Sequence, residues 1–185
     1  MKLIRFERPC NGEWPIEDLP NGWVYHNEIP NLKVVEEGLE SFKKDIGDYD
    51  GMWTIEDYKW RIQNGRKFYY ITENDKIIGF VWHSPSGKVL KTWDENNSPV
   101  YDTPSFDTKT EVITMDVGDN SSYSYNTWIT KKYRGFGRHI NLRSFREMEY
   151  LGKDSIINDV EIWNKGTVVH CIKHLQENII DLLDR

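Results

Sequence analysis

Apolar and polar positions change their spacing along this chain, and each spacing predicts an element. From 32 to 46 the apolar residues fall three and four positions apart, which predicts a helix. A second helix is expected from Thr54 through Asn64, with the threonine as its N-terminal cap. The runs 67–72 and 76–83 are rich in aromatic and β-branched residues and flank a polar turn, so they predict a β-hairpin. Two helices therefore precede the sheet.

The second half of the chain alternates between strand and helix patterns. Residues 111–117 and 123–129 are expected to be strands, and the turn between them predicts antiparallel pairing. A helix with one apolar stripe is expected from 140 onward, then a strand at 155–162 and a last helix over 167–183. A strand, helix, strand order favours a parallel pair at the end of a mixed sheet. The predicted class is α+β, a mostly antiparallel twisted sheet flanked by helices in three layers.

The chain length and the positions of prolines and glycines indicate the domain organisation. The 185 residues, 38% of them hydrophobic, suit a single domain over 1–185. Segment 1–31 contains four prolines and two glycines and is expected to be an irregular N-terminal arm. Prolines also break the short runs of 84–122, which is expected to be an extended insertion.

Charge and cysteine content limit the classes of binding partner and the cellular compartment. A net charge of −6 and a pI of about 5.4 argue against a general nucleic-acid binder and favour a cationic or amine substrate. Only Cys10 and Cys171 are present, so a reducing compartment is expected. Early charges argue against a signal peptide, and the sequence has no apolar run of 18 residues. A cytoplasmic protein without a membrane partner is therefore expected.

The stretch Lys132–His139 lies between an expected strand and an expected helix and suits the binding of phosphate. Gly135 and Gly137 allow a tight turn and a close approach to a ligand, while the helix start offers unpaired N–H groups. Arg134 and Arg138 add positive charge. This combination predicts an anion site, although glycine pairs also occur in ordinary turns.

The order of elements, together with residues 129–142, resembles the GNAT superfamily of acyl-CoA-dependent N-acetyltransferases. That family has Q/R-x-x-G-x-G/A at this loop. Starting from Lys132, Gly135 and Gly137 are in place and lysine replaces the opening residue; starting from Arg134, Gly137 fits and His139 replaces the last small residue. Asn164, after the following strand, also matches a position where the family often has asparagine.

The resemblance implies a splayed parallel strand pair and an N-acyltransferase that moves an acetyl or short acyl group from acetyl-CoA, or another acyl-CoA, to a primary amine. The amine would belong to a small molecule or a peptide, and the protein would be a monomer or a homodimer. Asn164 would line the cofactor channel. The main chain that would hold the pantetheine arm belongs to Trp128, Ile129 and Thr130. The amides that would hold the pyrophosphate belong to Arg134, Gly135, Phe136, Gly137, Arg138 and His139.

Three residues are candidates for proton transfer. Cys171 stands seven residues after Asn164, where the family often has a tyrosine acid, but a cysteine among apolar neighbours is also a common core residue. Glu111 would come level with the thioester if its strand pairs with the one ending at Ile129, and Glu161 would lie near the same end. Exposed sheet-edge carboxylates are the alternative for both.

Other candidates have ordinary alternatives. His170 and His174 have a metal-binding spacing without an evident third ligand, so no metal is predicted. Five tryptophans could line a substrate site or pack in the core, namely Trp53, Trp60, Trp82, Trp93 and Trp128. The acidic residues Asp102 and Asp107 would cover an amine substrate or lie in a solvated loop.

Two other functions remain open at this stage. The chain could be a GNAT-like CoA-binding module that has lost its chemistry, because fold does not guarantee activity. It could also be a protein-interaction domain whose cationic loop meets another phosphate or an acidic partner.

Overall fold

The computed structural model describes residues 2–47, 54–106 and 111–184. Its helices are α1 (Leu32–Ile46), α2 (Ile55–Gln63), the 3-10 turn η1 (Lys131–Tyr133), α3 (Arg138–Tyr150) and α4 (Lys165–Lys173). Its strands are β1 (Lys2–Pro9), β2 (Trp23–His26), β3 (Lys67–Glu73), β4 (Lys76–Ser84), β5 (Lys88–Trp93), β6 (Pro99–Tyr101), β7 (Ile113–Asp116), β8 (Ser121–Ile129), β9 (Ser155–Glu161) and β10 (Asn178–Asp184).

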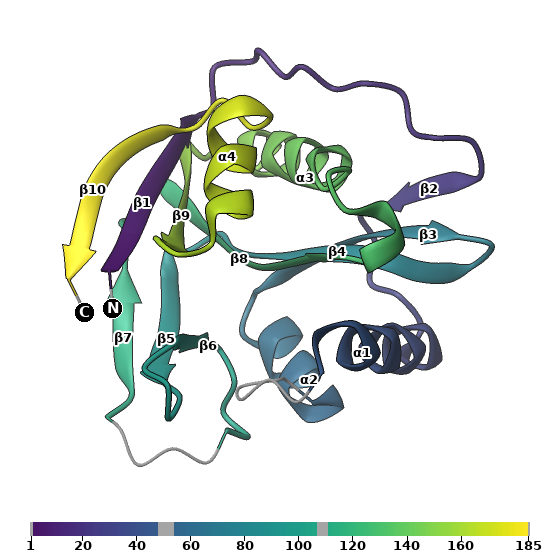
Figure 1. The fold of residues 1–185 in the computed structure, drawn as a ribbon, viewed down its shortest axis with the longest axis horizontal. Coiled ribbons are helices and arrows are strands. Elements are labelled where there is room, and N and C mark those ends of the chain that lie inside the picture. Colours follow the sequence, from purple (N-terminus) through teal and green to yellow (C-terminus); the bar gives the residue numbers. More distant parts are fainter. Residues whose placement is uncertain (1, 48–53, 107–110, 185) are drawn as a thin grey trace.

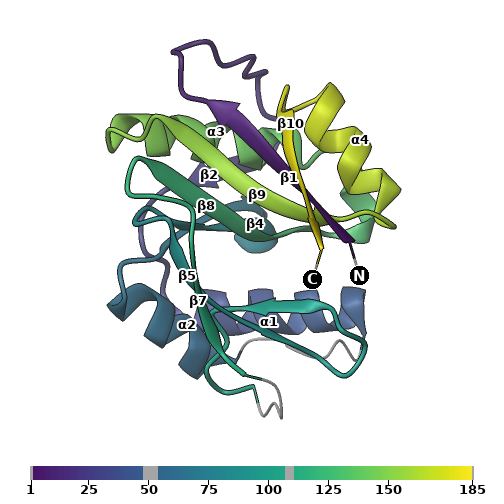
Figure 2. The ribbon, with the colours of Figure 1, turned by 90° about the vertical axis from the view of Figure 1, so that its left-hand side faces the viewer.

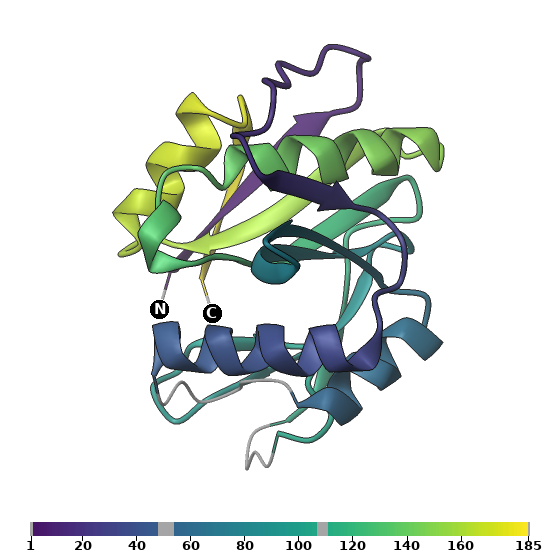
Figure 3. The same cartoon turned by 90° about the vertical axis from the view of Figure 1, so that its right-hand side faces the viewer.

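A seven-stranded sheet of order β10-β1-β9-β8-β4-β3-β2 forms the middle layer. Helices α3 and α4 cover one face, and α1 and α2 lie on the other (Figures 1 and 3). Each face has its own apolar core, because side chains alternate across a strand. Ile140 and Phe145 of α3 pack in one core, and Val35 and Leu39 of α1 pack in the other. This arrangement confirms the predicted α+β class.

A second sheet of order β6-β5-β7 lies on the same side of the main sheet as α1 and α2 (Figure 2). Its strands come from the segment expected to be an insertion. Tyr101 of β6 packs against Tyr123 and Tyr125 of β8, with ring centroids 5.5 Å and 6.2 Å apart. The small sheet therefore packs on the central strands of the large one.

The parallel pair of β8 and β9 is short. Only Ser121, Ser122 and Tyr123 pair with β9, and the last pair is Tyr123 with Ile157. Beyond that point β8 continues to Ile129 and β9 to Glu161 without pairing to each other. We call residues 124–129 and 158–161, which do not pair with each other, the unpaired stretch. This separation of the two strands confirms the expected splayed pair.

A β-bulge accompanies this separation. Trp82 of β4 pairs with Tyr125 and Phe80 pairs with Trp128, so β8 has one residue more than β4 between these pairs. Asn126 in the bulge has a φ of 48°, in the left-handed region that asparagine tolerates. A bulge bends its strand and increases its twist. The unpaired stretch therefore begins close to a local bend in β8.

The buried guanidinium of Arg61 on α2 supports the bulge. It donates to the Asn126 side chain at 3.0 Å and to the main-chain oxygens of Tyr101 and Asp102, both at 2.9 Å. Asp102 in turn accepts from Arg66 at 2.7 Å and from the Tyr125 hydroxyl at 2.5 Å. This network joins α2, the bulge of β8 and the small sheet.

Several local predictions are confirmed. Helices form at Leu32–Ile46 and Ile55–Gln63, and Thr54 and Asp57 cap the second one reciprocally. The hairpin of β3 and β4, the strands β8 and β9, and α3 also lie where the sequence predicts them. In each case the apolar spacing and the turn or cap residues point to the same element.

Three predictions that depend on distant contacts are wrong. The arm 1–31 is not irregular throughout, because Lys2–Pro9 is a strand between β9 and β10 and Trp23–His26 is an edge strand. The last helix ends at Lys173, Gln176 takes a φ of 54°, and Asn178–Asp184 becomes a strand paired with β1. Strand β7 pairs with β5, whereas the antiparallel neighbour of β8 is β4.

We expect Arg61→Leu to lower the free energy of unfolding by about 3 kcal/mol, because the variant leaves buried carbonyl and amide oxygens without their charged donor. Urea denaturation measures the loss. Lys59→Leu, on the same helix in a half-exposed pair with Glu56, is the control and should change stability by less than about 1 kcal/mol. Equal effects of the two variants would contradict the supporting role of Arg61.

Candidate functional site

The loop between β8 and α3 presents unused main-chain donors. Gly135 has a φ of 91°, which favours glycine, and Gly137 caps a helix of thirteen residues without a side-chain hydrogen bond. The amides of Phe136 and His139 are bonded within the loop. No hydrogen bond to a described residue engages the amides of Gly135, Gly137 and Arg138. The N–H groups of Gly137 and Arg138 belong to the positive end of α3, and that of Gly135 belongs to the turn just before it.

The cations of this loop differ in their partners. Lys132 lies 3.7 Å from Glu73, and Arg138 donates to Glu17 at 2.9 Å and to the Gly135 carbonyl at 3.1 Å. Hydrogen bonding to Arg138 lowers the pKa of the exposed Glu17 carboxyl. Arg134 is exposed and has no ion pair within the described ranges. Lys131, at the start of the loop, is likewise exposed without an ion pair to a described residue, so Arg134 and Lys131 are the loop cations available to an incoming anion.

Helix α4 lies against the same loop. A side chain at Gly137 would meet the imidazole Nε2 of His170 at 3.5 Å, an ordinary contact distance. Burial lowers the pKa of His170 to about 4, with smaller contributions from His174 and Arg138, so the ring is neutral at pH 7. Burial likewise lowers the pKa of His139. The start of α3 is therefore lined by neutral imidazoles.

The end of β8 has only part of its main chain free. The Thr130 N–H donates to Ile78 at 2.8 Å, and its carbonyl accepts from Tyr133 at 2.8 Å. Antiparallel pairing turns alternate residues toward the neighbour, so Ile129 directs its main-chain groups to the side of the unpaired stretch. Of the three residues predicted to hold a pantetheine arm, Ile129 is the best placed and Thr130 has no N–H to spare.

Comparison with solved structures places this architecture. A GCN5-related N-acetyltransferase from Sphaerobacter thermophilus superposes with a TM-score of 0.59 at 11% identity, over 98% of this chain and 49% of that one. A tandem GNAT protein from the clavulanic acid biosynthesis pathway gives 0.57 at 10% identity, over 98% and 51%. A GNAT-family protein from Novosphingobium aromaticivorans gives 0.58 at 11% identity, over 98% and 61%.

The chain has the GNAT fold. It spans about half the length of the first two of these structures. At the level of sequence, neither protein-family models nor curated proteins give a match. The likeness therefore concerns the fold, and the chemistry of the site depends on this chain's own residues.

In this GNAT fold the face of the sheet toward α1 carries a polar cluster beside the unpaired stretch. Asp159 accepts two hydrogen bonds from Arg5, at 2.7 Å and 2.8 Å, and one from the Tyr123 hydroxyl at 3.3 Å. Glu161 lies two residues further along β9 and hence on the same face. In the described chain Glu161 has no ion pair, so it is the free carboxylate of this cluster.

Two catalytic candidates are not placed for proton transfer at the end of β8. Cys171 is 2% exposed, with its sulfur 4.0 Å from the Asn158 side chain, and burial raises its pKa well above the usual range. It is therefore a core residue and not an accessible acid. Glu111 is exposed and precedes β7, which pairs with β5, so the pairing that would have brought it level with Ile129 does not occur. Asn164 caps α4 by accepting from the Thr167 amide at 3.3 Å.

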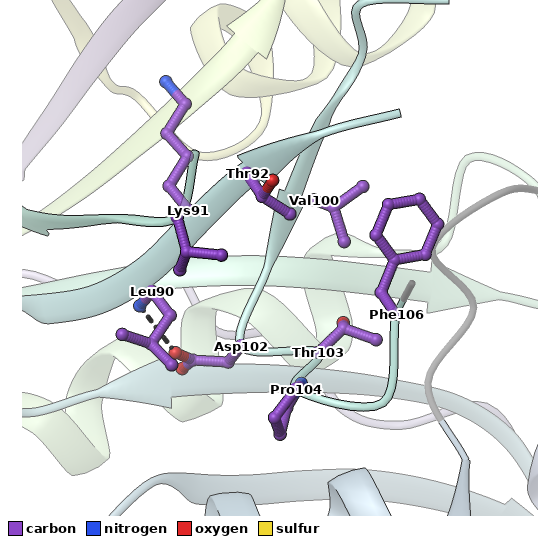
Figure 4. Close-up of a pocket in the computed structure, with 9 residues that line it drawn as sticks. Leu90, Lys91, Thr92, Val100, Asp102, Thr103, Pro104 and Phe106 are labelled. Carbon is purple, nitrogen blue, oxygen red and sulfur yellow. Dashed lines mark hydrogen bonds between the residues drawn. The ribbon is translucent and has the colours of Figure 1, made fainter. Parts of the chain in front are cut away.

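Two cavities among the described residues lie away from this site. A cavity of about 50 Å³ lies within the small sheet and is lined by Leu90, Asp102 and Phe106 among others (Figure 4). A second, of about 440 Å³, lies between α1 and α2. Asp102 is part of the Arg61 network and not a solvated loop residue, whereas Trp53 and Asp107 lie outside the described residues.

Two further findings concern metals and membranes. Within the three described ranges, His, Cys, Asp and Glu side chains form no group of three that could hold a metal ion. None of the described helices has the length and apolar character needed to cross a bilayer.

Gly135→Ala should lower the free energy of unfolding by about 1–2 kcal/mol, because alanine is strained at a φ of 91°. Gly137→Ala is the matched control, since Gly137 has a helical φ of −57° and room for a methyl group. Denaturant unfolding of both variants measures the difference. An equal loss at the two glycines would contradict this account of the turn.

Glu177 gives a second prediction, about pH. This carboxyl is 5% exposed beside Cys171 and Asn158, and burial raises its pKa to about 7. Since the folded pKa lies above the unfolded value of ~4.3, the stabilisation is complete below that value and is lost as the pH rises through about 7.

We therefore expect Glu177→Gln to gain stability relative to wild type between pH 5 and pH 8, as measured by urea denaturation at each pH. For Glu95→Gln, at an exposed turn, the difference in stability between variant and wild type should be the same at pH 5 and at pH 8. A parallel pH dependence of Glu177→Gln and wild type would count against a buried carboxylate with a raised pKa.

Proposed function

We propose that this protein transfers an acetyl or short acyl group from acyl-CoA to a primary amine. The observation that carries the proposal is the set of three unused N–H groups at the start of α3, next to the unpaired stretch of β8 and β9. The GNAT fold supports it, since the Sphaerobacter thermophilus protein with this fold is a GCN5-related N-acetyltransferase.

The diphosphate of CoA fits the loop by its charge. The amides of Gly135, Gly137 and Arg138 would donate to phosphate oxygens, and the positive end of α3 favours an anion there. Arg134 would add a charge-assisted bond from a side chain that has no competing carboxylate in the described chain. Phe136 and His139, whose amides are already bonded, would contribute by packing.

The pantetheine arm fits the unpaired stretch by its amide groups. Hydrogen bonds that β8 and β9 do not make to each other would be made to this arm, with Ile129 supplying main-chain groups. Such binding would place the thioester near the ends of both strands, at the level of Trp128 and Glu161.

Glu161 is the proposed base. Bound acyl-CoA supplies the thioester carbon that the amine attacks. The Glu161 carboxylate would hold the ammonium form of the acceptor and take one proton from it, directly or through a water, which frees the nitrogen lone pair to attack the thioester carbon. The C–S bond then breaks, and the second proton that the nitrogen gives up passes through water to the departing thiolate, because Cys171 is buried in the core. Positioning of the two substrates supplies most of the rate gain.

The compartment and the partners follow from the same proposal. Both cysteines are free thiols, which suits the reducing cytoplasm where acyl-CoA is made. The acceptor would be a small molecule or a peptide with a primary amine, and the negative net charge would favour its approach.

Calorimetry with acetyl-CoA, followed by thiol release with a panel of amines, tests this function. We expect binding, amine-dependent release of CoA, and a loss of about tenfold in acetyl-CoA affinity for Arg134→Glu. Lys76→Glu, at the exposed first residue of β4, is the charge-matched control and should bind as the wild type does. Absence of both binding heat and thiol release would refute the proposal, and binding without release would refute the transferase activity.

A further inference from the structure

Two polar atoms next to the unpaired stretch are buried without partners. They are the indole nitrogen of Trp128 and one carboxylate oxygen, Oε1, of Glu161, and neither has a hydrogen bond to any residue within the described ranges. Trp128 as a whole is 5% exposed. Leaving such groups unbonded away from water is costly, so native structures rarely do so without a reason. One atom is a donor and the other an acceptor, which suggests a ligand that satisfies both.

The two side chains lie on one face of the sheet. Trp128 packs in the core that contains α1, with its ring 5.8 Å from that of Phe42 and 5.3 Å from that of Phe80. Ile157 of β9 belongs to the same core, and Glu161, four residues later, has the same orientation. Burial raises the pKa of Tyr101, which packs on that face, and the charges of Asp159 and, to a smaller extent, Glu161 add to the rise.

The two side chains also lie at the same level. The last β8–β9 pair is Tyr123 with Ile157, and Trp128 follows it by five residues whereas Glu161 follows it by four. The bulge absorbs the extra residue of β8. Trp128 and Glu161 therefore flank the unpaired stretch from its two strands, where the acceptor would meet the thioester.

The charges around them limit the acceptor further. Asp159, the nearest carboxylate on the same face of β9, is already neutralised by Arg5 in a two-bond ion pair. One carboxylate is then left to bind a cation, which suits a single ammonium group better than a polyamine. A plain alkylamine would pair with Glu161 but would leave the indole N–H desolvated and unbonded.

We propose, on the basis of the acyl transfer proposed above, that Trp128 selects acceptors in which the primary amine carries a nearby hydroxyl, ether or carbonyl oxygen. Glu161 binds the ammonium group, and the Trp128 indole N–H donates to that oxygen. Trp128 is thus a specificity-determining residue that acts on the acceptor, in addition to the part its main chain plays in β8.

The test compares amino alcohols of two to four carbons with alkylamines of equal size, using thiol release at equal free-base concentrations. We expect the wild type to prefer the amino alcohols in kcat/KM. Trp128→Phe keeps an aromatic ring against Phe42 and Phe80 and removes the N–H. It should lower kcat/KM for the amino alcohols about tenfold more than for the alkylamines, because a lost hydrogen bond in a binding site has about this effect.

Two controls separate selectivity from general damage. Trp93→Phe, on β5 of the small sheet, should leave the ratio of the two classes unchanged, and Glu161→Gln should lower turnover of both classes alike. Affinity for acetyl-CoA reports whether Trp128→Phe remains folded. If Trp128→Phe does not fold, the test rests on whether the wild type prefers amino alcohols to alkylamines in kcat/KM.

Each result bears on a different claim. A wild type that acylates both classes equally, or a folded Trp128→Phe with an unchanged ratio, overturns the role of Trp128 and leaves the transferase standing. A wild type that binds acetyl-CoA and acylates no amine overturns both.

Discussion

The bond from Arg61 to Asn126 fixes the point at which β8 stops being an ordinary strand. At Tyr123, β8 pairs with both β4 and β9; from Ser124 onward, two residues before Asn126, β4 remains its partner and β9 does not. The bulge needs a residue in the left-handed region, and asparagine tolerates this while its side chain accepts from the guanidinium. The bulge therefore lies inside the unpaired stretch, next to the residues to which the proposed binding functions belong.

The desolvation of the Arg61 guanidinium explains which groups surround it. A guanidinium that is completely buried has its pKa lowered by desolvation. Its bonds to main-chain oxygens of Tyr101 and Asp102, and the rings of Trp82 and Tyr125 at 4.9 Å and 5.1 Å, offset the lost water. The small sheet therefore completes the environment of Arg61, in addition to covering the large sheet.

What the sequence predicted well was local. The capping box at Thr54, the turn before Lys76 and the stripe of α3 each lie within a few residues, and these elements are where they were expected. Strand β1 was missed because Arg5 interrupts its apolar pattern, and only Asp159, 154 residues away, makes that arginine a partly buried residue. The same limit applies to the site: the loop glycines are legible in sequence, whereas Arg61, Asn126 and the indole of Trp128 gain their roles from contacts between distant elements.

The two halves of the proposed site therefore tolerate sequence change differently. The CoA side uses main-chain N–H groups and a helix end, which nearly any sequence with a suitable turn can supply. The acceptor side uses the side chains of Trp128, Glu161 and the Arg5–Asp159 pair, which a single substitution removes. If the proposal holds, acceptor choice in this chain depends on side chains of the face toward α1, and acyl-CoA binding depends on the backbone of the loop before α3.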